Sequence, residues 1–319
     1  MRGWWRDLTD LVLPAECGGC EKPRTVLCPE CRAALTGAAP SRVRPMPEPS
    51  GLPATYATAP YADEVRAMLL AHKERGALAL AGPLGAALAG AVRVGVREAG
   101  WEGWGRGSPQ SSAQRHPDLR PTHLRATHLR PTHPRPPAQA PLLLVPVPSA
   151  RATVRARGHD PARRIALAAA GELRRTGTPA RVAAVLRQGR WVADQAGLNS
   201  RQRLENLAGA LEVVQGGGRL LAGVPVVLVD DLMTTGATLR EAARAVREAI
   251  GCEREVGATA AVYARASREG REEHTERSME NRRNMALSAT RFVGVNGPDD
   301  PVCAAVIAAS PDSFEINRN

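Results

Sequence analysis

The stretch VVLVDDLMTTGATLREAARAVREAI, residues 226–250, decides the fold. Its apolar start, residues 226–229, is typical of a buried strand, and the apolar spacing after residue 238 is typical of one helix face. Between the two lie paired carboxylates and a loop of small, hydroxyl-bearing residues. A loop that enters a helix offers free backbone N–H groups and the positive end of the helix dipole. The stretch therefore predicts an anion cradle between a strand and a helix.

The side chains of this loop suit a ligand that carries both a phosphate and a sugar diol. Gly236 lets the backbone turn tightly and approach a ligand oxygen, while threonine hydroxyls add hydrogen bonds. Asp230 and Asp231 would repel a phosphate, so they must face another part of the ligand, and a diol meets that requirement. The alternative is a helix-capping Asp in a Thr-rich turn without a ligand. It accounts for neither the doubled carboxylate nor the TTGAT that follows.

The order D-D-x-x-T-T-G-A-T resembles the phosphoribosyl diphosphate (PRPP) motif of type I phosphoribosyltransferases. The resemblance implies that Asp230 and Asp231 are the catalytic pair, which engages the ribose hydroxyls. It also implies that the loop holds the 5′-phosphate and that PRPP binds together with Mg²⁺. The substrate-binding residues of the loop are then Thr234, Thr235, Gly236, Ala237 and Thr238.

Short apolar runs alternate with helical stretches elsewhere in the chain. The runs cover residues 142–148, 180–186, 224–230 and 257–264, and the helical stretches lie near 161–175 and 238–250. This alternation indicates an α/β fold, and the resemblance makes it a type I phosphoribosyltransferase-like parallel sheet. Aromatic residues make up only 3% of the chain, so the core must be built from closely packed Ala, Val and Leu.

Further segments are similar to the ComF family, phosphoribosyltransferase-like proteins associated with competence and DNA uptake. They are residues 61–76, with Lys73 and Gly76; residues 144–160, with Arg157 and Gly158; and residues 186–213, with Gln195, Arg203 and Asn206. A cysteine module leads the chain, as in that family. One departure is His159 and Asp160, where the family usually has an aromatic residue and Asn. The acceptor pocket or its regulation is therefore expected to differ.

Several side chains outside the loop have two interpretations. Arg155 and Arg157 follow the Val-Pro run and are candidates for binding pyrophosphate through charge-assisted hydrogen bonds, with solvated surface arginines as the alternative. His159 is either a general acid or base or, as is more common for one histidine beside a loop, a plain polar contact. Residues 187–206 correspond in order to the mobile hood over the site in related transferases. Gln195, Arg203 and Asn206 suit that role or one in packing and capping.

Four of the six cysteines lie in two short knuckles, Cys17-x2-Cys20 and Cys28-x2-Cys31. Each knuckle is able to place two thiolates about 4 Å apart, so the pair predicts a tetrahedral, structural Zn²⁺ site in an N-terminal zinc ribbon. The alternatives are a redox pair, which lacks a βαβ context, and a disulfide framework, which needs an oxidising compartment. A module this small has hardly any core, so zinc would supply its folding free energy.

Composition divides the chain into four parts. We expect a zinc-ribbon module at residues 1–40, a Pro-rich linker at 41–60, a phosphoribosyltransferase-like domain at 61–265 and a polar tail of uncertain structure at 266–319. The domain is interrupted at about 106–140, where RPTHL, RATHL and RPTHP recur every five residues without Ile, Val, Phe, Trp or Tyr. Such a segment cannot build a core and is predicted to be a disordered insertion.

Charge and hydropathy predict a soluble protein. The start, MRGWWRDLTD, is charged where a signal peptide is apolar, and the uncharged run from Gly76 to Val92 is shorter than the about 20 residues that span a bilayer. We therefore expect a cytoplasmic protein with no membrane span. The net charge is +11, and nearly all basic residues are arginine. Arginine favours phosphate and nucleic-acid partners, although a GC-rich genome gives the same bias.

These features predict a PRPP-binding phosphoribosyltransferase-like protein with a role in competence and DNA uptake, that is, in transformation. They leave open whether it is a transferase or a non-catalytic sensor of a phosphoribosyl ligand. The sensor would bind single-stranded DNA or a helicase partner of the ComFA type. A purine-salvage phosphoribosyltransferase is a weaker alternative, since such enzymes seldom need a zinc ribbon.

Overall fold

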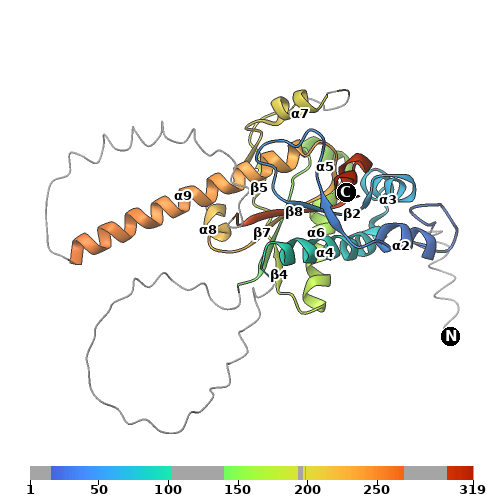
Figure 1. The fold of residues 1–319 in the computed structure, drawn as a ribbon, viewed down its shortest axis with the longest axis horizontal. Coiled ribbons are helices and arrows are strands. Elements are labelled where there is room, and N and C mark those ends of the chain that lie inside the picture. Colours follow the sequence, from blue (N-terminus) through green and yellow to red (C-terminus); the bar gives the residue numbers. More distant parts are fainter. Residues whose placement is uncertain (1–15, 102–139, 193–196, 198, 269–299, 319) are drawn as a thin grey trace, which may run out of the picture.

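The computed structural model describes residues 16–101, 140–192, 197, 199–268 and 300–318, and its centre is a six-stranded sheet (Figure 1). The strands lie in the order β1-β2-β8-β7-β3-β4, and all neighbours run parallel except β1 and β2. Their bounds are Ser41–Val43 (β1), Thr55–Pro60 (β2), Leu142–Pro146 (β3), Ala180–Val182 (β4), Val226–Met233 (β7) and Val302–Ala309 (β8). Two further strands, β5 (Leu186–Gln188) and β6 (Leu211–Val213), form a small antiparallel sheet. The expected α/β fold with a mostly parallel sheet is confirmed.

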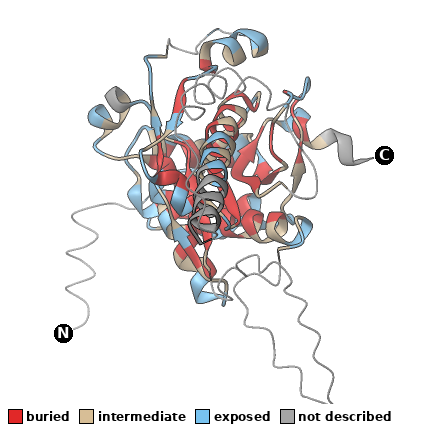
Figure 2. Cartoon of the chain, turned by 90° about the vertical axis from the view of Figure 1, so that its left-hand side faces the viewer, coloured by how far each residue is buried: buried red, intermediate tan, exposed pale blue. Residues whose placement is uncertain are grey.

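Helices cover both faces of the six-stranded sheet. α4 (Ala81–Glu98) and α6 (Pro161–Arg175) pack on one face, and α8 (Gly217–Leu221) and α9 (Ala237–Arg268) lie on the other. The remaining helices are α2 (Pro29–Thr36), α3 (Asp63–Lys73), α5 (Arg151–Arg157) and α7 (Ser200–Leu207), with 3₁₀-helices η1 (Leu78–Leu80) and η2 (Pro311–Arg318). Figure 2 shows the buried residues gathered between these layers and the exposed residues on their outer surfaces.

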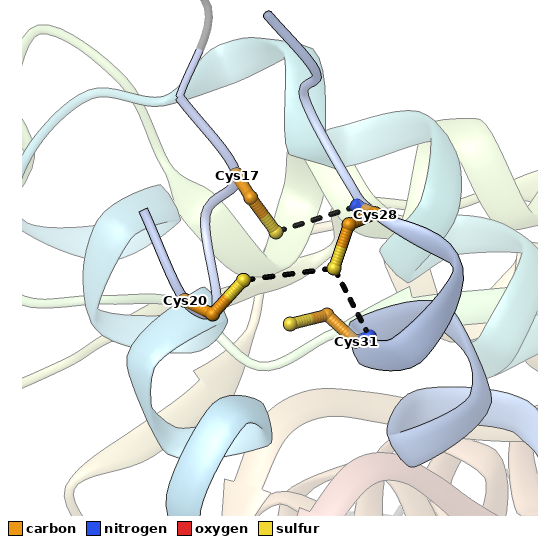
Figure 3. Close-up of side chains that lie close together, drawn as sticks. All are labelled: Cys17, Cys20, Cys28 and Cys31. Atoms are coloured by element: carbon orange, nitrogen blue, oxygen red, sulfur yellow. Dashed lines mark hydrogen bonds between the residues drawn. The ribbon is translucent and has the colours of Figure 1, made fainter. Parts of the chain in front are cut away.

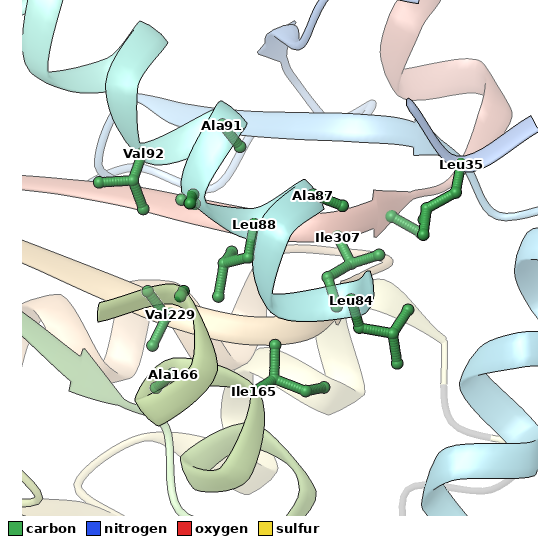
Figure 4. Close-up of a cluster of buried hydrophobic side chains, with 14 of the residues drawn as sticks. Leu35, Leu84, Ala87, Leu88, Ala91, Val92, Ile165, Ala166, Val229 and Ile307 are labelled. Carbon is green, nitrogen blue, oxygen red and sulfur yellow. The ribbon is translucent and has the colours of Figure 1, made fainter. Parts of the chain in front are cut away.

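Residues of β7 alternate between the two faces, because successive side chains of a strand point to opposite sides. Val229 packs with Leu88 of α4 and Ile165 of α6 (Figure 4). Leu228 belongs instead to the cluster that holds Val246 of α9. A parallel strand buried on both faces needs an unbroken apolar run, which is what residues 226–229 supply.

The helix pair on the first face packs closely because its residues are small. A Cβ on Gly85 of α4 would lie 2.4 Å from the Cβ of Ala168 in α6, so the two helix backbones approach where glycine meets alanine. Larger residues at these positions would push the helices apart. The close packing expected from a core of small side chains is therefore found between α4 and α6.

α4 also contains the most apolar helical stretch. Together with η1 it spans Leu78–Glu98, and within the described residues it is the one helix long and apolar enough to cross a membrane by length and composition. Half of this stretch is buried inside the protein, where α4 contacts α6, β2 and β8. These are the contacts of a core helix and are consistent with a soluble protein.

The prediction that residues 41–60 form a linker without helix or strand is wrong. β1 and β2 lie in this range and pair with each other in the central sheet. The prolines that suggested a linker fall between the strands, apart from Pro60, which is the last residue of β2. Proline is tolerated at a strand end, where no further ladder hydrogen bond is lost.

Two further expectations are corrected at the C-terminal end of the chain. Residues 257–264, expected to form a strand, are part of the long helix α9. The strand is β8, which lies within the range assigned to a polar tail and pairs with both β2 and β7. The predicted insertion at 106–140 lies outside the described residues except for Ala140, and so do Gln195 and the polar part of the tail at 269–299.

Candidate functional site

The loop between β7 and α9 lies at the carboxyl edge of the parallel strands. β7 ends at Met233 and α9 begins at Ala237, so residues 234–236 alone connect them. Gly236 has a φ of +73°, and a Cβ there would lie 3.0 Å from Cδ1 of Leu52. Glycine is therefore needed both for the left-handed turn and for space. The turn leads directly into the first backbone N–H groups of α9, which have no acceptor within the helix.

Asp230 and Asp231 face Lys73 at this edge of the sheet. Nζ of Lys73 lies 3.1 Å from a carboxylate oxygen of Asp231, whose side chain is only 10% exposed. The N–H of Asp231 donates a hydrogen bond of 2.9 Å to Oδ1 of Asp230. The two carboxyl groups and the ammonium group therefore form one electrostatic cluster.

Burial and charge shift the pKa values within this cluster. Burial, together with the neighbouring Asp231 carboxylate, raises the pKa of Asp230 well above its usual value. Burial alone would lower the pKa of Lys73, but the carboxylates of Asp231 and Asp230 outweigh it and raise that pKa. Lys73 is therefore held in its charged form. The positive charge of Lys73 therefore offsets the negative charge of the acidic pair beside the loop.

α3 brings Lys73 to the site from a distant part of the chain. Its apolar residues, Val65, Met68 and Leu69 among them, are buried against the core. Asp63 and Glu64 lie in its first turn and Lys73 in its last, which is the charge order that the helix dipole favours. The helix ends at Lys73, so the ammonium group projects from its C-terminal turn.

A hood, residues 186–213, covers the other side of the loop. It consists of β5, α7 and β6, and α7 begins with a capping box in which Asn199 and Gln202 bond each other's backbone. Leu204 and Leu207 of α7 pack against Ala237, the first residue of α9. Nη1 of Arg203 donates to Oγ1 of Thr234 at 3.4 Å. The hood therefore carries a guanidinium group to the loop.

Glu241 of α9 holds the base of the hood. Its carboxylate is buried and accepts a hydrogen bond of 3.1 Å from the N–H of Leu211 in β6. Arg244 bonds the same carboxylate and also donates to the carbonyl of Leu211 at 2.8 Å. The buried charge of Glu241 is thus paired, as buried carboxylates require.

The two candidate pyrophosphate ligands lie in different surroundings. Arg157, at the end of α5, forms a two-bond ion pair with Glu74, the residue that follows α3. It lies close enough to Lys73 to oppose the charge on that side chain. Arg155 is exposed, and its side chain makes no hydrogen bond or ion pair within the described part of the chain. The structure therefore brings Arg157 to the cluster of Lys73 and leaves Arg155 on the surface.

His159 makes polar contacts with the backbone. Its Nδ1 lies 3.3 Å from the carbonyl oxygen of Arg157, and its Nε2 lies 3.3 Å from that of His72. The two imidazole rings meet edge to face at a centroid distance of 5.7 Å. His159 thus connects the end of α3 to the turn between α5 and α6, and its two ring nitrogens point at backbone carbonyls.

The four N-terminal cysteines are positioned to hold a metal ion (Figure 3). Their Sγ atoms all lie within 4.8 Å of one another, and three of the four residues are buried. Tetrahedral Zn²⁺ with bonds of about 2.3 Å to sulfur requires such separations, so the donor set fits the predicted metal. Burial raises the pKa of the Cys17 thiol, but hydrogen bonds, the one from the N–H of Cys28 first among them, bring it down to about 6. The ligand form of this residue is therefore favoured.

The four-cysteine segment packs directly on the α/β layers. A Cβ on Gly18 would lie 2.5 Å from Cδ1 of Leu80, and one on Gly19 would lie 2.6 Å from Sγ of Cys31. Leu35 of α2 joins the same buried cluster as α4 (Figure 4). The segment is thus attached to the sheet by buried contacts, and its glycines leave room for the metal ligands and for η1.

Among the predicted site residues, the structure brings Asp230, Asp231 and the loop 234–238 together on consecutive positions of β7 and α9. Sequence reasoning assigned no role to Lys73 at the acidic pair. A signal was present, because Lys73 is one of only two lysines in a chain rich in arginine. The sequence did not predict its contact with Asp231, because the two residues are far apart along the chain.

One of two comparisons with known proteins found a match, and the match includes the loop. No curated protein matches the chain. The family model of the phosphoribosyl transferase domain matches residues 182–293, which include the hood, β7, the loop and α9. The part of the chain with the hood, β7, the loop and α9 is therefore similar to a phosphoribosyl transferase domain, and it lies in a chain with a mostly parallel sheet and a four-cysteine cluster.

Proposed function

We propose that the chain binds PRPP at the loop between β7 and α9. The observation that carries this proposal is the placement of an acidic pair, a left-handed glycine turn and a helix N-terminus on consecutive residues. The turn and the helix N-terminus suit a phosphate, and the carboxylates suit the hydroxyls of a sugar. PRPP carries both groups. It is also the ligand that the similar motif of type I phosphoribosyltransferases binds.

Each part of the cluster has a distinct role in this proposal. Asp230 and Asp231 hold the ribose through its hydroxyls, and residues 234–238 hold the 5′-phosphate. Arg157 and Arg155 are the candidates for the pyrophosphate group, and Arg157 would exchange its contact with Glu74 for the ligand. In a transfer reaction, C1 of the ribose develops positive charge as pyrophosphate leaves, and the neighbouring carboxylates stabilise that charge.

The oxygen-rich donor set around Asp230 and Asp231 suits Mg²⁺, which prefers hard oxygen ligands. When bound with PRPP, Mg²⁺ neutralises charge on the pyrophosphate. The chain's own contribution is to orient the sugar: Lys73 holds Asp231 in place, and Arg203 reaches the loop from the hood.

We further propose a role on the cytoplasmic side of DNA uptake, in competence. The support is the resemblance to the ComF family in several segments, together with the four-cysteine site at the start of the chain. Zinc is structural in this proposal, because four thiolates leave no open position for a substrate.

A non-catalytic sensor is the second candidate. It is favoured by His159, the one proton-transfer candidate of the sequence, whose two ring nitrogens face backbone carbonyls. Such a sensor would bind the same ligand and pass the signal to single-stranded DNA or a helicase of the ComFA type. Purine salvage is less well supported, since that chemistry has no use for a zinc ribbon.

Release of pyrophosphate separates the candidates. Purified protein is incubated with PRPP, Mg²⁺ and acceptors that include free bases and single-stranded DNA, and the D230N/D231N variant is the control. Release that needs an acceptor and is lost in the variant supports a transferase. PRPP binding without release supports the sensor, and the absence of PRPP binding contradicts both.

A further inference from the structure

A pocket of about 410 Å³ lies at the β1 edge of the sheet, and no residue of the PRPP loop lines it. Arginines from two elements converge on it, Arg42 and Arg44 from β1 and its end and Arg97 from the last turns of α4. The other polar residues that line it are Ser41, Glu98 and Ser313.

The charge of this pocket is strongly positive. Its lining includes three guanidinium groups and one carboxylate, that of Glu98, which accepts a hydrogen bond of 3.0 Å from the hydroxyl of Tyr56. Arg44 has a distant ion pair of 3.9 Å with Glu48. The guanidinium group of Arg97 makes no hydrogen bond or ion pair within the part of the chain that the structure describes. Like charges gathered in a half-buried pocket repel each other, and an anion would remove that repulsion.

Guanidinium groups and hydroxyls are the donors that recognise phosphate. An arginine fork gives two parallel hydrogen bonds to phosphate oxygens, and Ser41 and Ser313 add hydroxyl donors. The volume falls within the range of small-molecule sites, about 300–1,000 Å³. We propose that this pocket binds a small phosphorylated ligand of nucleotide size, at a second site of the protein.

The pocket is separate from the PRPP loop. β2 and β8 lie between β1 and β7 in the sheet. Arg42 is paired with Tyr56, near the start of β2, whereas the PRPP loop follows the carboxyl end of β7. A ligand in this pocket would therefore contact neither Asp230 nor Asp231.

Arginine modification by phenylglyoxal tests the proposal at the level of single residues. The full chain is modified with AMP, with adenosine or with neither, and the extent of reaction at each arginine is measured by mass spectrometry. AMP is expected to slow modification of Arg97 and Arg42 several-fold, and adenosine, which lacks the phosphate, is not. Arg93 is the matched control on the same helix, because it already donates to Thr176 and lies outside the pocket.

Two variants separate this site from the PRPP loop. In G236V, where the loop is expected to lose phosphate binding, AMP should still protect Arg97. Adding R97A to G236V should weaken AMP binding about tenfold or more, as expected for loss of a charged hydrogen bond, whereas adding R93A should not. Equal modification of Arg97 with and without AMP would overturn the proposal. Protection of Arg97 that disappears in G236V would overturn it as well, because the effect would then come from the loop.

Discussion

The ammonium group of Lys73 lies 3.1 Å from the carboxylate of Asp231, and this contact joins the end of α3 to the end of β7. The two residues are far apart in the sequence, yet each reaches the same edge of the sheet. The charge of the ammonium group also acts on Asp230, the second member of the acidic pair, and each group favours the charged form of the other. Lys73 thus offsets the negative charge of two adjacent carboxyl groups beside the loop between β7 and α9.

Replacing Lys73 by Gln should lower the free energy of unfolding by about 1–3 kcal/mol. Removing one partner of a fully buried pair costs about 3–5 kcal/mol, but the Lys73 side chain is 35% exposed, so water screens part of the loss. Urea denaturation at neutral pH measures the change. Lys22→Gln is the matched control, because Lys22 lies 3.9 Å from Glu30 with both side chains exposed. Equal losses in the two variants would show that the Lys73 contact is an ordinary surface pair.

Replacing Asp230 by Asn should stabilise the protein at neutral pH by about 0.5–2 kcal/mol, since function rather than folding requires this carboxylate. The pKa of Asp230 is raised in the folded state, so folding binds a proton that the unfolded chain releases more readily. Stability from this group therefore falls as pH rises through the raised pKa. The gain of Asp230→Asn should be present at neutral pH and shrink toward pH 4. Asp312→Asn, at an exposed position, should show no such trend, and a gain that does not depend on pH would contradict the account.

Replacing Gly236 by Val should abolish binding of inorganic phosphate as well as of PRPP. The β-branched side chain would be strained at φ +73° and would occupy space beside Leu52, so the loop could not keep its turn. Gly177→Val is the matched control, because Gly177 has φ +88° and a Cβ added there would meet no atom within 4 Å. Both variants should lose stability by about 1–3 kcal/mol, as strained backbone does, but only Gly236→Val should lose the ligand. Retained phosphate binding in Gly236→Val would exclude the loop as the anion site.

Elemental analysis should find one zinc per chain in the wild type, and none after replacement of Cys17 and Cys28 by Ser. Cys252→Ser, at an exposed cysteine outside the cluster, should retain the metal. Because Gly18 lies against Leu80, loss of the metal should loosen η1 and the neighbouring end of α3 as well as residues 16–37. Hydrogen exchange measures this, with the strands β7 and β8 expected to stay protected. Wild-type protein that lacks metal but has a protected N-terminal segment would contradict the assignment.

The loop between β7 and α9 could be predicted from the sequence because its residues are consecutive. Strand, acidic pair, glycine turn and helix follow one another within 226–250, so no distant contact is needed to define them. The zinc site is local in the same way, since its four ligands lie within 17–31. The position of Lys73 beside Asp231 and the pairing of β1 with β2 depend on contacts between separate segments. The spacing of residues along the chain does not predict such contacts.

β8, the last strand in the sequence, also could not be predicted from local residues alone. Residues 260–264 read AAVYA and residues 304–308 read AAVIA, so the two segments have almost the same apolar pattern. The first lies in α9 and the second in β8. A short apolar run suits either a strand or a buried helix, and the choice depends on which segment can reach the gap between β2 and β7. The prolines at 301 and 311, which flank β8, were the local signal for a separate strand.

Titration of PRPP and of inorganic phosphate into wild type and the D230N/D231N variant tests the central claim most directly. The carboxylates should contact the sugar and the loop the phosphate, so the variant should bind PRPP about tenfold or more weakly, since each charged hydrogen bond is worth about 1.5–3 kcal/mol. Its affinity for inorganic phosphate should not fall, because the variant keeps the loop and loses two carboxylates that repel phosphate. Equal affinity of the two proteins for PRPP would contradict the assignment of this site.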